Sequence, residues 1–253
     1  MNADILPLLL ALVLIHLIGD FLLQPVAWVE ERYRLRQRSP RLALHALIHG
    51  LLAGGVLTIA ATQEAGRGPG AVLLGALAVA MSHWLIDLAK AALPTGRLRW
   101  FLLDQALHLL VMTLLWLAWI GSIQPMADLL RWLVTPEVLG VATAYLLVSR
   151  PLSIVIALVM QRWSHQLEET GTLVQAGARI GMLERFLVLT LVLLDQLIVV
   201  GFLLAAKSVL RFGDLREAQD RKLTEYVLLG TLLSVSTTLA LGLIIRLVLA
   251  SPP

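Results

Sequence analysis

The chain has 253 residues, of which 58% are hydrophobic and only 15% are charged. Its mean hydropathy of +0.84 is far above that of water-soluble domains, so a soluble protein is excluded. The net charge of +3 comes from 20 Lys and Arg against 17 Asp and Glu, and no basic stripe of the kind that binds nucleic acid is present. The absence of Cys excludes disulfides, thiolate catalysis and sulfur ligands, so any metal ion would be held by histidines and carboxylates.

Seven apolar segments, each close to the roughly 20 residues that cross a bilayer, predict an all-α, multi-pass membrane protein. They are residues 3–24, 41–63, 70–93, 99–124, 135–161, 181–206 and 226–250. The segment 135–161 is the weakest because Arg150 and Pro151 interrupt it, so it is a full span, a pair of half-helices or a re-entrant segment. We therefore expect six or seven crossings, an interfacial segment at 161–180 and a charged loop at 207–225.

Basic residues gather in the loops after the first and third spans. They are Arg32, Arg34, Arg36, Arg38 and Arg41 in one loop and Lys90, Arg97 and Arg99 in the other. By the positive-inside rule these loops are cytoplasmic, so the N-terminus is predicted to be extracytoplasmic.

Four pairs of ionisable residues lie within the first four spans, each with a spacing of four residues. They are His16 with Asp20, His45 with His49, His83 with Asp87, and Asp104 with His108. Residues four apart share one helix face, so each helix offers two ligands along one stripe. Since each ionisable group in a bilayer costs on the order of 2.5–3.5 kcal/mol even on insertion scales, eight of them together indicate a functional site.

The four pairs are also predicted to share one depth, because successive helices run in opposite directions. The pairs come late in the first and third spans and early in the second and fourth, which puts them all in the cytoplasmic half of the membrane. The spacing predicts two stacked layers, one rich in carboxylates (Asp20, His45, Asp87, Asp104) and one of four histidines (His16, His49, His83, His108).

The first four spans form two similar hairpins, with HxxxD then HxxxH in the first and HxxxD then DxxxH in the second. Such a duplication predicts a four-helix bundle with a pseudo-twofold axis along the membrane normal. We therefore expect a metal-binding pair of repeats at 1–124 and a C-terminal transmembrane region at 125–253.

A metal site is the leading interpretation of the eight residues, with a proton relay and purely structural pairing as alternatives. Imidazole and carboxylate ligands without sulfur suit Zn²⁺ best, with Fe, Mn or Co as competitors. Eight candidates exceed the needs of one tetrahedral ion, so either two ions share carboxylates or one ion leaves the other groups to orient ligands and supply a base.

Other polar residues are candidates for orienting ligands or binding a substrate. Gln24 and Gln105 lie close in sequence to Asp20 and Asp104, and a hydroxyl at Ser82 could donate to an oxyanion. Lys207 and Arg211 are either helix-end charges or a binding site for a phosphate or carboxylate headgroup.

The remaining charged residues in or near the apolar segments are expected to have structural roles. Lys90 is expected to reach towards the membrane interface, and Glu184 with Arg185 reads as a pair of helix-end charges. Asp195 falls in the middle of the predicted span 181–206 and needs a partner, for which Arg150 is the candidate.

The motifs HLIGDFLLQP at 16–25, HALIH at 45–49, SHWLID at 82–87 and DQALH at 104–108 resemble the N-terminal signature of a bacterial integral-membrane family of unknown function. IGMLER at 180–185, GFLLAAKSVLRF at 201–212 and EYVLLGTLLS at 225–234 resemble its longer members. The resemblance implies the bacterial inner membrane and brings no established activity. The HxxxH and SHxxxD patterns are also similar to the ligand pattern of intramembrane zinc hydrolases such as alkaline ceramidases and adiponectin-receptor relatives, as an analogy of site chemistry only.

These features predict a metal-dependent hydrolase in the cytoplasmic leaflet, acting on a lipid or another membrane-borne amide or ester. The metal would lower the pKa of a bound water, and a spare carboxylate, Asp20 or Asp104, would take its proton. The expected partners are membrane lipids and the substrate, with no nucleic acid. A divalent-cation or proton-coupled transporter is the alternative, although the apolar outer halves of these helices offer no path, and a membrane scaffold would need none of the eight residues.

Overall fold

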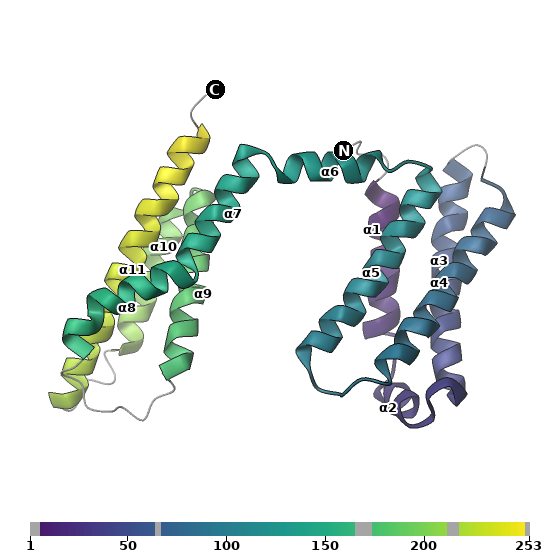
Figure 1. Ribbon diagram of the computed structural model, residues 1–253, viewed down its shortest axis with the longest axis horizontal. Coiled ribbons are helices and arrows are strands. Elements are labelled where there is room, and N and C mark those ends of the chain that lie inside the picture. Colours follow the sequence, from purple (N-terminus) through teal and green to yellow (C-terminus); the bar gives the residue numbers. More distant parts are fainter. Residues whose placement is uncertain (1–5, 64–66, 165–173, 212–217, 251–253) are drawn as a thin grey trace. The chain divides into compact units, whose positions relative to one another are not determined.

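The computed structural model describes residues 6–63, 67–164, 174–211 and 218–250, and these residues form helices joined by short connections (Figure 1). The helices are α1 (Leu6–Phe21), α2 (Val26–Leu35), η1 (Arg36–Arg38), α3 (Pro40–Gln63), α4 (Pro69–Lys90), α5 (Leu98–Ile120), α6 (Gln124–Leu133), α7 (Pro136–Val148), α8 (Arg150–Ser164), α9 (Val174–Leu193), α10 (Leu197–Arg211) and α11 (Ala218–Ala250). Residues 165–173 of the interfacial segment expected at 161–180 lie outside the described residues, as do residues 212–217 of the charged loop expected at 207–225. The described parts of both segments are helical, so the loop is shorter than expected.

By length and composition, five segments of the described chain can cross a membrane. They are α3, α4, α5, the pair α7–α8 (Pro136–Trp163) and most of α11 (Glu225–Leu249). The pair α1–α2 would be a sixth, although its helices meet at an angle of 81°. Leucines such as Leu51 and Leu74, which are 66% and 71% exposed, face outward as lipid contact requires. The chain is an all-α, multi-pass membrane protein, and its described residues offer five spans, or six with the bent pair, where six or seven were expected.

The predicted span 181–206 is wrong, because the structure divides it into α9 and α10. Asp195 adopts a φ of +61° at the break, and the amide of Gln196 donates to the carbonyl of Leu191 at 2.7 Å, which ends α9. The two helices then run antiparallel, since Lys207 Nζ meets Glu184 Oε2 at 2.5 Å across the turn. Asp195 is therefore not buried in mid-helix.

The predicted partner of Asp195 is wrong for the same reason. The carboxylate lies in the turn, 68% exposed, and pairs with Arg246 of α11 at 2.5 Å. Arg150 is exposed at the start of α8. A sequence reading that placed Asp195 inside a helix could not anticipate a partner from the last helix.

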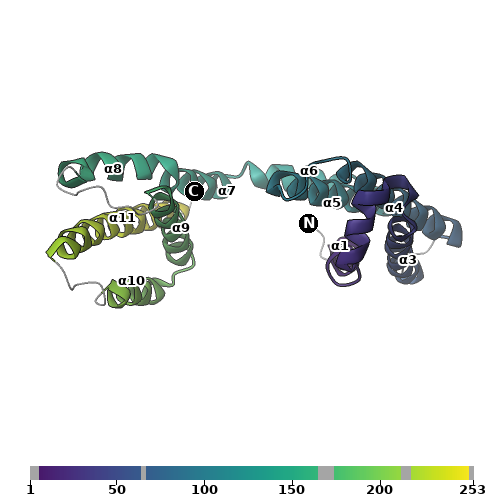
Figure 2. The ribbon, with the colours of Figure 1, turned by 90° about the horizontal axis from the view of Figure 1, so that it is seen from below.

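The chain divides into two compact units, Met1–Leu129 and Leu130–Pro253. In the first unit α1 and α4 each pack against both α3 and α5, so these four helices close into a bundle (Figure 1). Helix α2 turns away from α1 and packs against α3 (Figure 2). The helices α3 and α4 approach closely at two glycines. A Cβ on Gly50 would lie 2.9 Å from the carbonyl oxygen of Ala76, and one on Gly75 would lie 2.5 Å from Leu57 Cδ1.

In the second unit α11 packs against α7, α8 and α9, and α10 packs against α9. The apolar segment 135–161 contains the expected interruption, because α7 ends at Val148 and α8 begins at Arg150. Pro151 has no N–H to donate to the preceding turn, so carbonyls at the break lose their helical partners. Arg185 of α9 donates hydrogen bonds to two of these carbonyls. Its Nε donates to Val148 O at 2.6 Å and its Nη2 to Ser149 O at 3.1 Å.

Candidate metal centre

The bundle brings the eight predicted histidines and aspartates into one buried cluster, two from each of α1, α3, α4 and α5. The five histidines are 0–1% exposed, and Asp87 and Asp104 are 2% and 3% exposed. Asp20 is the most accessible member, with 11% of its side chain exposed. The imidazole rings lie against one another, with those of His49 and His83 stacked at a centroid separation of 3.6 Å.

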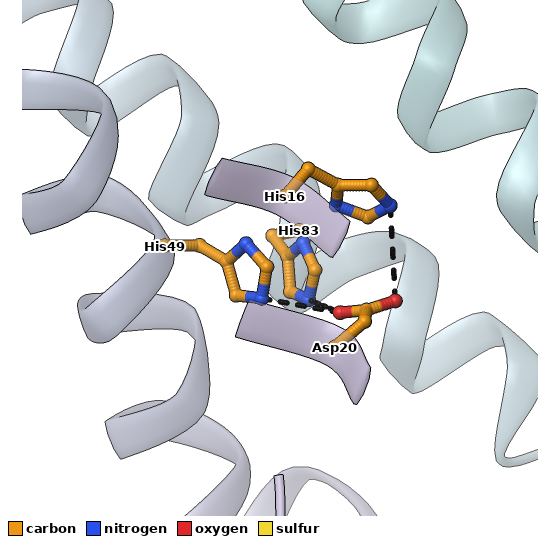
Figure 3. Close-up of side chains that lie close together, drawn as sticks. All are labelled: His16, Asp20, His49 and His83. Carbon is orange, nitrogen blue, oxygen red and sulfur yellow. Dashed lines mark ion pairs between the residues drawn. The ribbon is translucent and has the colours of Figure 1, made fainter. Parts of the chain in front are cut away.

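One oxygen of Asp20 lies at the centre of three imidazoles. Its Oδ1 is 3.3 Å from His45 Nε2, 3.1 Å from His49 Nε2 and 3.4 Å from His83 Nε2. The other oxygen, Oδ2, faces His16 Nε2 at 3.8 Å. Figure 3 shows His49 and His83 pointing to one side of the Asp20 carboxylate and His16 to the other. Asp20 therefore connects α1 to both α3 and α4.

These short separations are not ordinary hydrogen bonds. Within the described chain, neither Asp20 Oδ1 nor His49 Nε2 has a partner in hydrogen-bond geometry, although both atoms are buried. Buried polar atoms in native proteins nearly always have a partner, which can be an ion or a water. The atoms converge on a common region of space, as ligands do.

The distances also match the edges of a zinc coordination shell. Zinc lies about 2.0–2.1 Å from nitrogen and oxygen ligands, and in a tetrahedron that gives edges of about 3.3–3.4 Å between ligand atoms. The three Asp20 contacts are 3.1–3.4 Å long, and His45 Nε2 lies 3.1 Å from His83 Nε2. Four of the six edges of a tetrahedron made by Asp20, His45, His49 and His83 thus have the right length. A second set, His16, Asp20, His49 and His83, has potential ligand atoms that all lie within 4.8 Å of one another.

Two further groups of side chains have potential ligand atoms within 4.8 Å of one another. One is His45, His83 and Asp87, and the other is Asp20, Asp104 and His108. Nδ1 of His108 lies 2.9 Å from the backbone carbonyl of Asp104, which can only accept, so Nδ1 carries the proton. In the neutral ring Nε2 then holds a lone pair, and it is buried without a partner in the described structure. His108 is thus oriented as a ligand or a base.

Two cations compensate the aspartates of the cluster. Arg32 of α2, which is 3% exposed, forms an ion pair with Asp87, and Lys90 forms one with Asp104. Lys90 does not merely reach to the interface, as its position near a helix end had led us to expect. Three carboxylates against two cations leave a net charge of −1 with neutral imidazoles, so the cluster favours a cation.

Gln105 links the carboxylates, as its position beside Asp104 predicts. Its amide nitrogen donates to Asp20 Oδ2 at 3.1 Å and to Asp104 Oδ2 at 3.2 Å. Its carbonyl oxygen lies 3.4 Å from His16 Nε2. This network fixes the direction of Asp20 Oδ1 towards the three imidazoles.

An apolar layer lies one helical turn beyond the four histidines His16, His49, His83 and His108. It consists of Leu12, Ala53, Val79 and Met112, each at most 1% exposed, and Trp116 extends it. Each of the four lies four residues from a histidine on the same helix, so they line the same interior face. The polar interior of the bundle therefore ends at this layer.

The predicted substrate-binding residues do not join the cluster. Ser82 donates its hydroxyl to the carbonyls of Ala78 and Val79 in its own helix, and so does not point at the site. Gln24 is half-buried in the turn after α1, with no described hydrogen bond to the cluster. Lys207 belongs to the second unit, where Glu184 neutralises it, and the side chain of Arg211 lies outside the described structure.

The sequence does not reveal the structural roles of three residues. In sequence Arg32 reads as a topology signal and Arg185 as a helix-end charge, whereas the structure pairs Arg32 with Asp87 and buries Arg185. At Gly19 an added Cβ would lie 2.3 Å from His49 Cε1. A signal exists for Gly19, since it is the one glycine of α1 and directly precedes Asp20.

A model of a known protein family matches the part of the chain that contains the bundle. A family model described as a protein of unknown function, DUF3307, matches residues 8–135 of the chain. The chain belongs to the DUF3307 family. The DUF3307 match contains all eight histidines and aspartates of the cluster, together with Arg32, Lys90 and Gln105. The motifs IGMLER, GFLLAAKSVLRF and EYVLLGTLLS lie beyond it. No curated protein and no solved structure matches the chain.

Proposed function

We propose that the DUF3307 bundle binds a divalent metal ion, with zinc as the best fit, and uses it for hydrolysis within the membrane. The observation that carries this is the position of Asp20 Oδ1, 3.1–3.4 Å from three imidazole nitrogens without hydrogen-bond geometry. His45, His49 and His83 would be the imidazole ligands and Asp20 the carboxylate ligand.

The charge of the cluster favours one ion. A divalent ion added to the net charge of −1 gives +1, and a bound hydroxide brings the sum to zero. A neutral sum minimises the cost of burying the site in a medium of low dielectric constant. Two ions would leave the same site with several uncompensated positive charges.

A water bound to the ion would be the nucleophile, because zinc lowers the pKa of its water towards neutrality. Asp104 is the base we favour, since its Oδ1 is buried and lacks a hydrogen-bond partner among the described residues, with His108 Nδ1 at 3.8 Å. It also lies in one group with Asp20 and His108, all within 4.8 Å. Lys90 and Gln105 hold its other oxygen, which leaves Oδ1 for the water.

The substrate class follows from the surroundings. The helices that carry the cluster present leucines to lipid, so a substrate that arrives from the bilayer is a lipid or another membrane-borne amide or ester. The accessible edge of Asp20 lies at the end of the bundle where α1 meets α2. We infer from the basic residues in α2 and η1 that this end is cytoplasmic and that the N-terminus is extracytoplasmic. The resemblance of the motifs to a bacterial family favours the bacterial inner membrane.

Elemental analysis of the purified full chain tests the metal. We expect about one zinc per chain, lost in His49→Ala and retained in the matched control His165→Ala, which changes the sixth histidine and lies outside the family match. A folded wild-type protein that takes up no zinc, iron, manganese or cobalt would overturn the proposal.

Hydrolysis is tested separately with long-chain acyl esters and anilides in mixed micelles. Asp104→Asn should keep the zinc but lose most of the turnover, by roughly 10²- to 10⁴-fold for a general base. Zinc uptake by proteoliposomes, without hydrolysis, would instead support the transporter that shares these residues. The apolar layer at Leu12 and Val79 argues against a continuous path.

A further inference from the structure

The second unit contains a cavity of about 500 Å³ between α8, α9, α10 and α11. This volume lies within the range of small-molecule and lipid sites, about 300–1,000 Å³. Much of its wall consists of small or apolar side chains, such as Ala157, Gly177, Ala178, Ile180 and Gly230. The cavity is formed by the second unit alone and is independent of the metal centre proposed above.

Arg185 is the buried charge in this wall. It is 4% exposed, and three of its donor contacts are anchored: Nε on Val148 O, and Nη2 on Ser149 O and on the hydroxyl of Ser153. These contacts hold the guanidinium plane in one orientation. They satisfy hydrogen bonds but supply no negative charge.

Nη1 is the part of the guanidinium left for a ligand. Its contact in the described structure is a long one, 3.5 Å to the hydroxyl of Ser234. A Cβ on Gly181 would lie 3.5 Å from Nη1, so the glycine leaves that nitrogen uncovered. Gly181, Ser234 and Arg185 all line the cavity.

The charges around the cavity do not balance. Glu184 and Lys207 line it too, but they neutralise each other at 2.5 Å. The charge of Arg185 is therefore uncompensated among the described groups that line the cavity. Burying an unpaired charge in a protein that faces lipid is costly, and an anion beside Nη1 would remove that cost.

We propose that this cavity binds an anionic lipid, with a phosphate or carboxylate headgroup at Arg185 Nη1 and an acyl chain along the apolar wall. Guanidinium groups favour these two anions, and the Ser234 and Tyr226 hydroxyls that line the cavity are further donors. Arg185 thus has two roles: it satisfies the broken backbone between α7 and α8, and it recognises the headgroup.

Native mass spectrometry of the full chain in detergent tests this with four probes: dioleoyl phosphatidic acid, oleate, dioleoylglycerol and inorganic phosphate. We expect saturable binding of one phosphatidic acid or oleate, and much weaker binding of the neutral dioleoylglycerol. Arg185→Gln removes the charge and keeps an amide donor, and should weaken binding roughly tenfold to hundredfold.

A second variant tests the cavity without touching Arg185. At Gly177 the space around an added Cβ is open, so Gly177→Leu should fill the cavity and weaken binding by a similar factor. Gly201→Leu is the matched control, because Gly201 is exposed on α10, has equally open space and does not line the cavity.

Lipid binding that is unchanged in both Arg185→Gln and Gly177→Leu would overturn the assignment, as would equal binding of dioleoylglycerol. Binding of inorganic phosphate with the same sensitivity to Arg185→Gln, and with no added affinity from an acyl chain, would replace the lipid with a soluble anion.

Discussion

At the scale of single residues, the position of His49 depends on a neighbour that has no side chain. Gly19 precedes Asp20 on α1, and the imidazole of His49 occupies the space where a Cβ would stand, 2.3 Å from Cε1 and 2.4 Å from Nε2. Alanine favours a helix over glycine by about 1 kcal/mol, so the glycine is retained against local propensity. Its role is to let the imidazole of His49, on α3, approach the backbone of α1 closely.

Gly19→Ala should therefore abolish zinc binding while the helices remain formed. The added methyl group displaces His49 from Asp20 Oδ1, whereas the secondary structure gains from the better helix former. Zinc content by elemental analysis and helix content by circular dichroism measure the two effects. Gly55→Ala is the control, because Gly55 is exposed on α3 with open space around it. Zinc retention in Gly19→Ala would contradict the role given to Gly19.

The candidate ligands could be predicted from sequence because their spacing of four is a local property of a helix. Alternation of helix direction then aligned eight side chains from four helices at one depth. Ser82 was a false candidate, since its hydroxyl has an acceptor one turn back in its own helix. Arg32 and Gly19 escaped notice because their partners, Asp87 and His49, belong to other helices.

At the scale of helices, α2 is attached to the bundle by two sets of contacts. Arg32 pairs with the buried Asp87, and Glu31 accepts the hydroxyl of Ser39 at 2.8 Å and pairs with Arg41 at 3.1 Å. Ser39 in turn accepts the amide of Leu42 at 3.1 Å and so caps α3. The basic hairpin after α1 is thus a structural part of the site as well as a topology signal.

Arg32→Ala should destabilise the first unit by about 3–5 kcal/mol, because it leaves the Asp87 carboxylate buried without its cation. Much of the loss should be recovered in the double variant with Asp87→Ala, which removes both charges. Unfolding by sodium dodecyl sulfate in mixed micelles measures these differences. Arg34→Ala, an exposed position on the same helix, should change the stability by less than about 0.5 kcal/mol. Equal losses of stability in Arg32→Ala and Arg34→Ala would show that the Arg32–Asp87 ion pair does not stabilise the unit.

The helices of the first unit were easier to predict than those of the second. Residues 41–63, 70–93 and 99–124 correspond to α3, α4 and α5 within a few positions. The segment 181–206 is apolar almost throughout, and only Asp195 and Gln196 mark the turn between α9 and α10. Hydropathy measures affinity for lipid, and it does not distinguish one long helix from two short antiparallel ones.

At the scale of the whole chain, the candidate metal centre belongs to one of two compact units. The proposed ligands lie on α1, α3, α4 and α5, all within Met1–Leu129. A ligand that binds only the folded state stabilises the part that holds it, by about 2.7 kcal/mol at a hundredfold excess over its dissociation constant. The two units should therefore respond differently to the metal.

Adding zinc to the metal-free full chain should slow amide hydrogen exchange in α1, α3, α4 and α5 and leave α9 and α11 unchanged. Exchange followed by mass spectrometry resolves these helices. Magnesium at the same concentration is the control, because it prefers oxygen ligands in octahedral geometry and should have little effect. Equal protection in both units would indicate that the ion binds elsewhere.

The apolar layer formed by Leu12, Ala53, Val79 and Met112 has a consequence for energy conversion. Water or ions that entered from the Asp20 side would stop at this layer, so protons released by the proposed hydrolysis would return to the compartment from which the water came. No charge would then cross the full electric field of the membrane during turnover. Hydrolysis by this bundle would thus leave the membrane potential untouched, and its rate would be the same in energised and de-energised vesicles.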